Sequence, residues 1–257
     1  MDALGLYALK ILFWYSDLWK DRYVKQYDLA GIPNAPLRYR VWGDPNIHSF
    51  LGSGIRCGED IKGALQAIGK ELTYFQRILD FGCGCGRILM FVESDLHPSA
   101  SLHGTDIDKE AIDYCASTYA HRFQQNRHLP PLSYSSEFFD LVLAIAVFRH
   151  FNEHDQFMWL DELKRILKPG GIALVSVHGR YCWKNFPPRE RKILETKGFL
   201  FKPLRDPYHR RVFPQWYQAS YHNRTYIIEH YSRYFHILSY LTCEIENETD
   251  LVVLQKR

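Results

Sequence analysis

One short segment, ILDFGCGCGRIL at residues 78–89, limits most strongly what this chain can fold into. Its first apolar run is interrupted at Asp80, glycine then occupies every second position at Gly82, Gly84 and Gly86, and another apolar run follows. Glycine adopts positive φ without a steric penalty and lets a ligand approach the backbone closely. The segment therefore predicts a buried strand, a tight turn and a helix, an arrangement typical of ligand sites at the carboxyl edge of a parallel sheet.

The spacing of these glycines differs from that of two common phosphate-binding loops. The dinucleotide pattern G-x-G-x-x-G would place its third glycine at position 87, where the chain has Arg87. The G-K-S or G-K-T ending of a P-loop is also absent. Asp106 lies about twenty residues beyond the turn, at the end of the next predicted strand, where a carboxylate can accept hydrogen bonds from both ribose hydroxyls. The turn and this acid together favour an adenosine-containing ligand.

Strand and helix patterns alternate through the middle of the chain. Strands are predicted at 77–81, 101–108, 138–147 and 172–178, with helices from Arg87, at 109–120 and at 152–167. Such alternation predicts an α/β fold with a parallel sheet and right-handed crossovers. Two further apolar runs at 235–244 and 250–256, joined by a short acidic turn, predict an antiparallel hairpin that closes the sheet edge.

The segments around this core have a different character. A helix, a loop rich in proline and glycine, and a short helix are predicted at 4–27, 31–45 and 58–69. A stretch rich in proline, arginine and aromatic residues at 180–222 predicts an insertion that covers the carboxyl ends of the strands. We therefore predict a helical N-terminal cap segment (1–72) and a core (73–257) that carries a lid insertion (180–222).

The composition narrows the class of protein. Apolar residues make up 46% and charged residues 24% of the 257 residues, which is ordinary for a globular protein, and the net charge of +3 gives little support for nucleic-acid binding. The six cysteines are scattered without a C-x-x-C pair, which argues against a zinc ribbon. Asp2 precedes the first apolar run and no small-residue cleavage site follows, so we expect no signal peptide and a cytoplasmic protein with free thiols.

The apolar and aromatic run at residues 3–19 has two interpretations. It could lie in a membrane interface, although a helix packed over the body of the protein is favoured. No apolar run in the sequence approaches the roughly 20 residues that a membrane-spanning helix needs.

Several segments together resemble the successive motifs of class I S-adenosylmethionine-dependent methyltransferases. They are ILDFGCGCGRIL, LHGTDIDKEAI, FDLVLAIAVFRHF and ELKRILKPGGIALVSVHG, and the ending HYSRYFHIL…DLVVLQK also fits. The resemblance implies a Rossmann-like seven-stranded sheet whose last strand is antiparallel. Together with the flanking segments, the expected fold is an α/β sheet with a helical N-terminal cap and a lid before the last two strands.

The resemblance also implies which residues bind S-adenosylmethionine. The methionine half would be wrapped by Asp80, Gly82, Cys83, Gly84 and Gly86. Asp106 would bind the ribose, Ile107 would lie against the adenine, and Ala144 with the residues just past it would border the sulfonium. The acidic residue that many relatives place before the fourth strand is missing from QQNRHLPPLSYSS, where Asn126 or a backbone group would have to replace it.

Cys83 and Cys85 fill the gaps between the glycines, where a crowded turn requires small side chains. Cysteine behaves as a small apolar residue, and this interpretation is favoured over a thiol nucleophile or a metal ligand because C-x-C alone lacks further ligands. The sequence shows no cluster of acids suited to a divalent metal, so we expect no metal site.

Candidate catalytic residues lie at the predicted carboxyl edge of the sheet. His178 ends one strand, where a base or substrate contact and a structural hydrogen bond are equally supported, whereas a structural role is favoured for His150. Arg149 could pair with an anionic group of the substrate or lie exposed.

Three residues near the end of the lid are further candidates for the substrate pocket. Tyr217 and Tyr221 are expected to form part of its wall, while a structural or helix-capping role is favoured for the nearby His222.

Two features of the sequence bear on the methyl acceptor: a signature motif that is absent after the fourth strand, and the cap and lid segments that flank the core. The N/D-P-P-Y/F signature of many nucleic-acid amine methyltransferases is absent, since AIAVF follows the fourth strand. The cap and lid favour an O or N atom of a small organic molecule, such as a sugar or a secondary metabolite. The alternatives are a protein or RNA acceptor bound by the basic segments PPRERK and RDPYHRR, a cofactor-binding protein without turnover, and a membrane-linked acceptor reached through the aromatic N-terminus.

Overall fold

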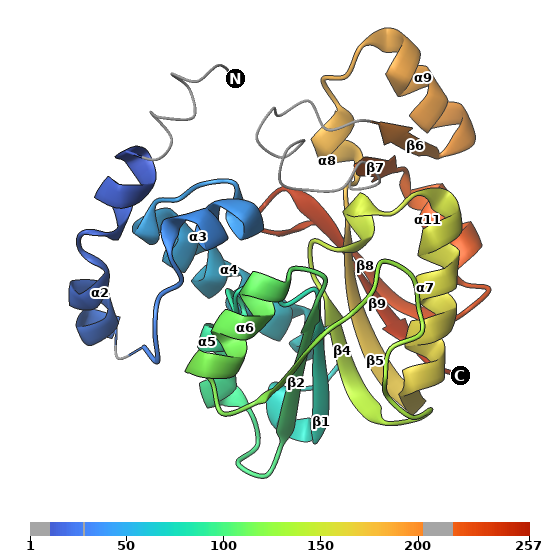
Figure 1. The fold of residues 1–257 in the computed structure, drawn as a ribbon. Helices are drawn as coiled ribbons and strands as arrows, with labels where there is room; N and C mark the ends of the chain where they lie inside the picture. The colour runs from blue at the N-terminus through green and yellow to red at the C-terminus, as the bar shows by residue number, and fades with distance from the viewer. Residues whose placement is uncertain (1–10, 28, 203–217) are drawn as a thin grey trace.

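The computed structural model describes residues 11–27, 29–202 and 218–257, and its centre is a seven-stranded sheet (Figure 1). The strands are β1 (Arg77–Phe81), β2 (Ser101–Asp106), β3 (Arg122–Gln125), β4 (Phe139–Ala144), β5 (Leu167–Val177), β8 (His236–Ile245) and β9 (Thr249–Gln255). Their order is β3-β2-β1-β4-β5-β9-β8, with β1 to β5 parallel and β9 antiparallel to both of its neighbours. The predicted parallel sheet with an antiparallel last strand is confirmed.

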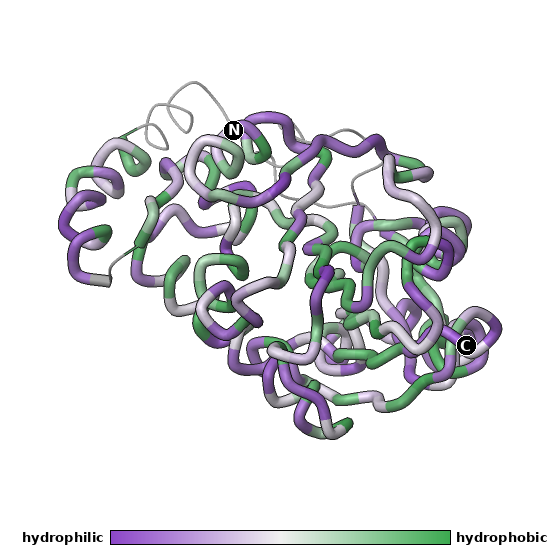
Figure 2. Tube along the Cα trace, turned by 90° about the horizontal axis from the view of Figure 1, so that it is seen from below, coloured by the Kyte–Doolittle hydropathy of each residue, from purple (hydrophilic) through white to green (hydrophobic). Residues whose placement is uncertain are grey.

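Helices cover both faces of the sheet. Helices α7 (Glu153–Ile166) and α11 (Arg224–Tyr231) pack on one face, and α4 (Ile47–Gln66), α5 (Leu89–Val92) and α6 (Lys109–Thr118) on the other. In β4, Val142 and Ala144 pack in the hydrophobic core under α7 and α11. Leu141 and Leu143 point to the other face and pack in the core under α4, α5 and α6. Because both faces of β4 are buried, its sequence is a continuous apolar run. Hydrophobic segments of the chain as a whole gather inside the body of the protein (Figure 2).

Two groups of elements flank the carboxyl ends of the parallel strands, one at the left and the other at the upper right of the molecule in Figure 1. The first comes from the N-terminal part of the chain and contains α2 (Lys20–Tyr27) and α3 (Ala35–Trp42). The second comes from the predicted lid and contains α8 (Arg180–Trp183), α9 (Pro188–Lys197), and β6 (Phe199–Lys202) paired antiparallel with β7 (Ala219–His222). The basic segment at 205–211 lies outside the described residues.

The N-terminal part departs from the prediction in three places. The helix predicted at 4–27 is interrupted by a turn at Leu18 and Trp19, with residues 1–10 outside the described part. The segment at 31–45 is not a loop, because it contains α3: the side chain of Asn34 accepts the N–H of Leu37, and Gly43 ends the helix at φ 85°. Its proline and turn-forming residues therefore act as helix caps.

The third departure concerns the helix predicted at 58–69, which begins earlier, at Ile47. The side chain of Asn46 caps α4 by accepting the N–H of Ser49. The first turns of α4 were not predicted because they contain glycines, and glycine has a low helix propensity. In the folded protein, tertiary packing overrides this low propensity.

No helix among the described residues combines the length and the apolar character needed to cross a membrane.

Candidate active site

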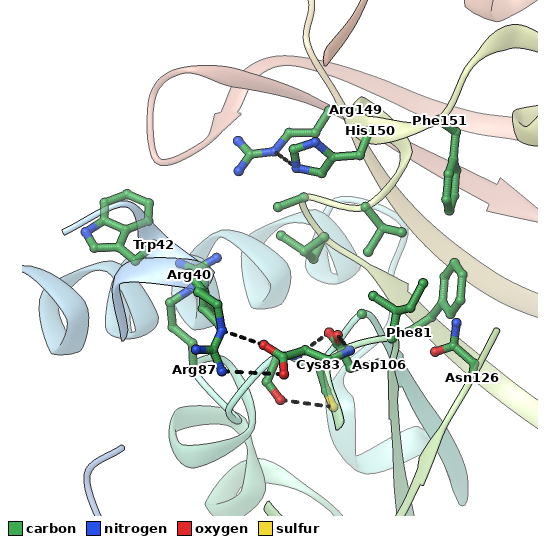
Figure 3. A pocket seen from close by; sticks show the side chains of 18 of the residues that line it. Arg40, Trp42, Phe81, Cys83, Arg87, Asp106, Asn126, Arg149, His150 and Phe151 are labelled. Atoms are coloured by element: carbon green, nitrogen blue, oxygen red, sulfur yellow. Dashed lines mark hydrogen bonds and ion pairs between the residues drawn. The ribbon is translucent and has the colours of Figure 1, made fainter. Parts of the chain in front are cut away.

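A cavity of about 360 Å³ opens where β1, β2, β4 and β5 end (Figure 3). Its lining comes from the glycine turn and from the ends of β2 and β3. It also includes residues 145–147 and 149–151 after β4, residues 40–43 at the end of α3, and His178, Ala219 and Tyr221. Segments far apart in the sequence therefore meet at one site, as expected for the carboxyl edge of an open α/β sheet.

The glycine turn is held against β2 and against the loop after β4. The N–H groups of Gly82 and Cys83 both donate to the carbonyl of Thr105, with N···O distances of 2.7 and 3.0 Å. Gly82 has φ 80°, and a Cβ there would lie 2.2 Å from Cγ2 of Val147. The turn thus needs glycine for its backbone conformation and also for the close approach of the neighbouring loop.

Asp106 fastens the turn from the end of β2. Its Oδ2 accepts the N–H of Gly84 and its Oδ1 accepts the N–H of Asp108, both at 2.8 Å. The same carboxyl group lines the cavity, between the turn and the start of α6. Asp106 therefore presents an oriented carboxylate to any ligand that occupies this end.

Asp80, at the end of β1, has a contrasting environment. Its side chain is only 1% exposed, and Oδ2 has no hydrogen-bond partner in the described part of the chain. Burial, and then the nearby Asp106, raise the pKa of Asp80 to about 7, against the opposing charge of Arg87. A buried carboxyl oxygen without a partner is costly, so this group is suited to a bound cation.

The sequence did not predict that Arg40, Trp42 and Arg87 line the cavity, where they connect the N-terminal helices to the core. Arg40 pairs with Asp108 and with Glu110, with N···O distances of 2.7 Å for both. Arg87 lies 3.5 Å from Glu246 and 5.1 Å from the ring of Trp42. These contacts join segments far apart in sequence, and α3 was predicted to be a loop, so no local pattern could have indicated them.

Asn126 lies just beyond β3, where an acid was missing from the sequence. Its backbone N–H donates to the carbonyl of Asp106 at 2.9 Å, which holds the residue beside the cavity. The side-chain nitrogen donates to the carbonyl of Arg127, whereas Oδ1 is buried and has no hydrogen-bond partner in the described part. An acceptor without a partner is thus available for an amino group in the cavity.

His178 lines the cavity directly after β5, on the side of Arg149, which lies across the pocket from Asp106 (Figure 3). Its Nδ1 lies 3.1 Å from the carbonyl oxygen of Ser220, and its ring stacks on Tyr221 at a centroid distance of 4.9 Å. Because a carbonyl only accepts, Nδ1 carries the proton and Nε2 carries the lone pair. Burial, and next the charge of Arg149, lower the pKa of His178 to about 3, so the ring is neutral.

His150 has both ring nitrogens engaged. Nδ1 donates to the carbonyl of Gln218 at 2.8 Å, and Nε2 accepts the Nε–H of Arg149 at 3.2 Å. His150 lines the cavity together with Arg149 and Tyr221.

His222, in contrast, does not line the cavity. It is fully buried, and its Nε2 lies 3.0 Å from the side-chain nitrogen of Gln156, in a network with Ser220 and Tyr231. Asn223, not His222, caps α11. The structure therefore places His222 in this buried network and not on the cavity wall, as its favoured structural role predicts, and Tyr217 falls outside the described residues.

The remaining predicted cofactor residues fall into two groups. Gly82, Cys83, Gly84, Asp106 and Ile107 line the cavity, whereas Asp80, Gly86 and Ala144 lie behind its lining. After Ala144, the lining is formed by Ile145, Ala146 and Val147.

The two cysteines of the turn are buried. Cys85 packs against Ile32, Leu37 and Phe50 of the N-terminal segment, and burial raises its pKa well above the ordinary value. All six cysteines of the chain are free. Within the described ranges, no group of three or more His, Cys, Asp or Glu side chains could hold a metal ion.

A glycine turn between the first strand and the first core helix, an acid at the end of β2 and an antiparallel β9 beside β5 define the Rossmann-like methyltransferase fold. Residues 78–171 match a protein family described as a methyltransferase domain. The chain therefore carries a class I S-adenosylmethionine-dependent methyltransferase domain, whose cofactor is S-adenosylmethionine.

Three comparisons give the range of relatives. A tRNA (carboxymethyluridine(34)-5-O)-methyltransferase of Arabidopsis thaliana is 35% identical over 102 residues, which is 39% of this chain and 23% of the relative. A probable phthiotriol/phenolphthiotriol dimycocerosates methyltransferase 2 of Mycobacterium ulcerans is 30% identical over 106 residues, 37% of each chain.

A solved structure of an S-adenosylmethionine-dependent methyltransferase from Methanosarcina mazei has a TM-score of 0.51 at 21% identity, covering 70% of this chain and 92% of its own. This likeness concerns the fold. The chain spans less than two thirds of either curated relative, and the two differ in their substrates.

Proposed function

We propose that this protein transfers the methyl group of S-adenosylmethionine to an O or N atom of a small organic molecule. One observation carries the proposal: a single cavity has the glycine turn and Asp106 at one end and the unprotonated Nε2 of His178 at the other. A nucleoside site and a neutral base on opposite sides of one cavity suit an in-line transfer between two bound molecules.

The residues at the first end fit the cofactor in chemistry. The Oδ2 of Asp80 lacks a partner and, from just behind the lining, would attract the ammonium group of the methionine half. The oriented carboxylate of Asp106 suits the ribose hydroxyls. The Oδ1 of Asn126 suits the adenine amino group. Gly82, Cys83, Gly84 and Ile107 would contact the cofactor, with Gly86 holding the turn and Ala144 leading into the loop that borders the sulfonium.

At the other end, His178 would act as the general base. When bound, the cofactor supplies an electrophilic methyl group on a positively charged sulfur. The acceptor oxygen or nitrogen forms a bond to this carbon, the carbon–sulfur bond breaks with its electron pair staying on sulfur, and the acceptor proton moves to Nε2 of His178. His150 would serve as a positioning residue, because both of its ring nitrogens are engaged by Gln218 and Arg149.

The segments that form the walls of the cavity support a small acceptor. Residues 40–43 of the N-terminal segment and Tyr221 of the lid strand β7 form parts of its wall, so both flanking segments contribute to the pocket. We accordingly propose the division into a cap (1–72) and a core (73–257) with a lid (180–222). A small acceptor suits such a pocket better than a folded macromolecule does.

Two features support rival acceptors. The tRNA methyltransferase among the relatives, and the exposed Arg189, Arg191 and Lys192 of α9, favour an RNA acceptor. The exposed aromatic side chains at 11–19 favour contact with a membrane and a lipid-linked acceptor.

The test uses methyl-labelled S-adenosylmethionine, purified protein and cell extract separated by size. Label in the low-mass fraction, which mass spectrometry would then trace to a product, is the expected result. Label in RNA or protein would overturn the small-molecule acceptor, and intact cofactor binding without label in any fraction would indicate binding without turnover.

A further inference from the structure

The arginines that line the cavity differ in whether they have an acidic partner. Arg40 and Arg87 are both paired with carboxylates, and Arg127 is exposed. Arg149 is partly buried and forms no ion pair with any acid in the described part of the chain. Its charge acts on Glu246 only at longer range, and that carboxylate already pairs with Arg56 and Arg87. A cation that is partly removed from water without a counter-ion is costly, so its place on the cavity wall calls for an anion from outside the chain.

The orientation of Arg149 is fixed by hydrogen bonds on one side only. Its Nε donates to Nε2 of His150 at 3.2 Å, and His150 is itself held by the carbonyl of Gln218 at 2.8 Å. No hydrogen bond of the two terminal guanidinium nitrogens occurs within residues 11–27, 29–202 and 218–257. These nitrogens form a planar fork that matches the two oxygens of a carboxylate or phosphate.

The position of Arg149 belongs to the acceptor end of the cavity. It lies in the loop after β4, across the open space from Cys83 and Asp106 (Figure 3). Its charge acts on His178, whose pKa it lowers, and on Tyr221 of the same wall. Arg149 is therefore close to the proposed base and distant from the nucleoside end.

We propose that Arg149 binds an oxyanion group of the methyl acceptor, so that the acceptor is a small anionic molecule with a carboxylate or phosphate group. The inference rests on the proposed methyl transfer, which it extends by naming the class of acceptor. It follows from an oriented guanidinium that lines the cavity, has no acidic partner in the described ranges and lies beside the acceptor end.

The bound anion would also change His178. The groups that face this ring are Arg149, the carbonyl of Ser220, Tyr221 and the neutral His222. Of these, only Arg149 is charged, and an anion paired with it cancels the field that disfavours the imidazolium. His178 thus becomes a better proton acceptor when the correct substrate is bound, and a neutral analogue lacks this effect.

The experiment divides the low-mass extract by anion exchange at neutral pH into a retained anionic pool and an unretained pool. Each pool is incubated with methyl-labelled S-adenosylmethionine and either the wild-type protein, Arg149→Gln or Arg180→Gln. Arg180 is an exposed arginine outside the cavity and serves as the matched control. Cofactor affinity is measured for all three proteins by calorimetry.

We expect the wild type and Arg180→Gln to label the retained pool. Arg149→Gln should label it about tenfold to a hundredfold more slowly, the loss expected for a charge-assisted hydrogen-bonded pair, with unchanged cofactor affinity. Arg149→Lys should recover only part of the rate, because lysine keeps the charge and loses the fork. Treating the retained pool with phosphatase distinguishes a phosphate monoester, whose labelling is lost, from a carboxylate, whose labelling persists.

Two results would overturn the inference while leaving methyl transfer intact: label from the wild type only in the unretained pool, or full labelling of the retained pool by Arg149→Gln. Absence of label in both pools would refute the transfer itself, and the inference would fall with it.

Discussion

Asp80 and Asp106 end neighbouring strands, yet their surroundings give them different properties. Both oxygens of Asp106 accept backbone N–H groups, whereas Oδ2 of Asp80 has no partner among the described residues. Hydrogen bonds favour the ionised form of a carboxyl group, and burial favours the neutral form. Burial also raises the pKa of Asp106, but the backbone hydrogen bonds from Asp108 and Gly84 oppose this rise. The two carboxyl groups therefore differ in how well their ionised forms are stabilised.

Asp80 should make cofactor binding depend on pH. With a pKa of about 7, it is neutral at lower pH, and an ammonium group binds better to its ionised form. The affinity for S-adenosylmethionine should therefore rise by up to about tenfold per pH unit and level off above about pH 7. Calorimetry from about pH 5.5 to about pH 8 would show this rise in the wild type and a flat profile in Asp80→Asn. A rise of equal size in both proteins would contradict the assignment.

The unliganded protein should show the opposite trend in stability. The folded pKa of Asp80 lies above its ordinary value of 3.8, so the folded state binds more protons than the unfolded state between those values. The free energy of unfolding should fall as the pH rises through this window, and Asp80→Asn should remove that part of the fall. Denaturant titrations of both proteins at several pH values would measure it.

Asp106→Ala should reduce the affinity for S-adenosylmethionine by at least about tenfold to a hundredfold, since a charged hydrogen-bond acceptor contributes about 1.5 to 3 kcal/mol. The change also releases the N–H groups of Gly84 and Asp108. Asp95→Ala is the matched control, because that acid lies away from the cavity and pairs with Lys62 at 2.8 Å. Unaltered binding by Asp106→Ala in equilibrium dialysis would refute the proposed cofactor site.

At the scale of elements, the glycine turn depends on the loop after β4 as much as on its own backbone. Gly82→Ala combines a strained φ of 80° with a Cβ placed 2.2 Å from Val147. Gly170→Ala provides the matched control, with φ 75° and open space around the new Cβ. We expect both variants to lose about 1 to 3 kcal/mol of stability from strain, and only Gly82→Ala to lose cofactor binding. Thermal unfolding with and without cofactor would separate the two effects.

The sequence predicted the elements whose signals are local. The strands around the glycine turn, the helix predicted at 152–167 and the final hairpin all carry their pattern within a few residues, and the structure confirms them. β3 was missed because its four residues, RFQQ, are a half-buried edge strand without an apolar run.

Residues of the candidate active site could be predicted from the sequence only where they belong to one local motif. The turn and Asp106 follow from spacing, whereas the contacts of Arg40 with Asp108 and of Arg87 with Glu246 join residues 68 and 159 positions apart. The burial of His222 likewise depends on Gln156 of α7, which no local pattern around position 222 reveals. Such contacts arise from tertiary packing, and a single sequence carries no local signal for them.

At the scale of the whole molecule, exposed apolar side chains concentrate on one segment. Trp14, Tyr15 and Trp19 are 66%, 63% and 55% exposed, and Ile11, Leu12 and Leu18 are about half exposed. Lys20, Arg22 and Lys25 follow directly. Aromatic rings beside basic side chains suit the headgroup region of an anionic bilayer.

Replacing both Trp14 and Trp19 with Ser should reduce co-sedimentation with vesicles that contain phosphatidylserine by about tenfold, without changing cofactor affinity. Tyr74→Ser is the control, because that ring is 60% exposed elsewhere on the surface. Equal sedimentation of all three proteins would argue against membrane contact through this segment.

The ion pair between Arg87 and Glu246 has a consequence for how the protein is made. Arg87 directly follows the glycine turn, and it is held by Ser53 from one side and by Glu246, in the turn between β8 and β9, from the other. Ser53 is translated before the glycine turn, whereas Glu246 is translated long after it. The full set of contacts around Arg87 therefore forms only after the final hairpin has been translated and has paired with β5.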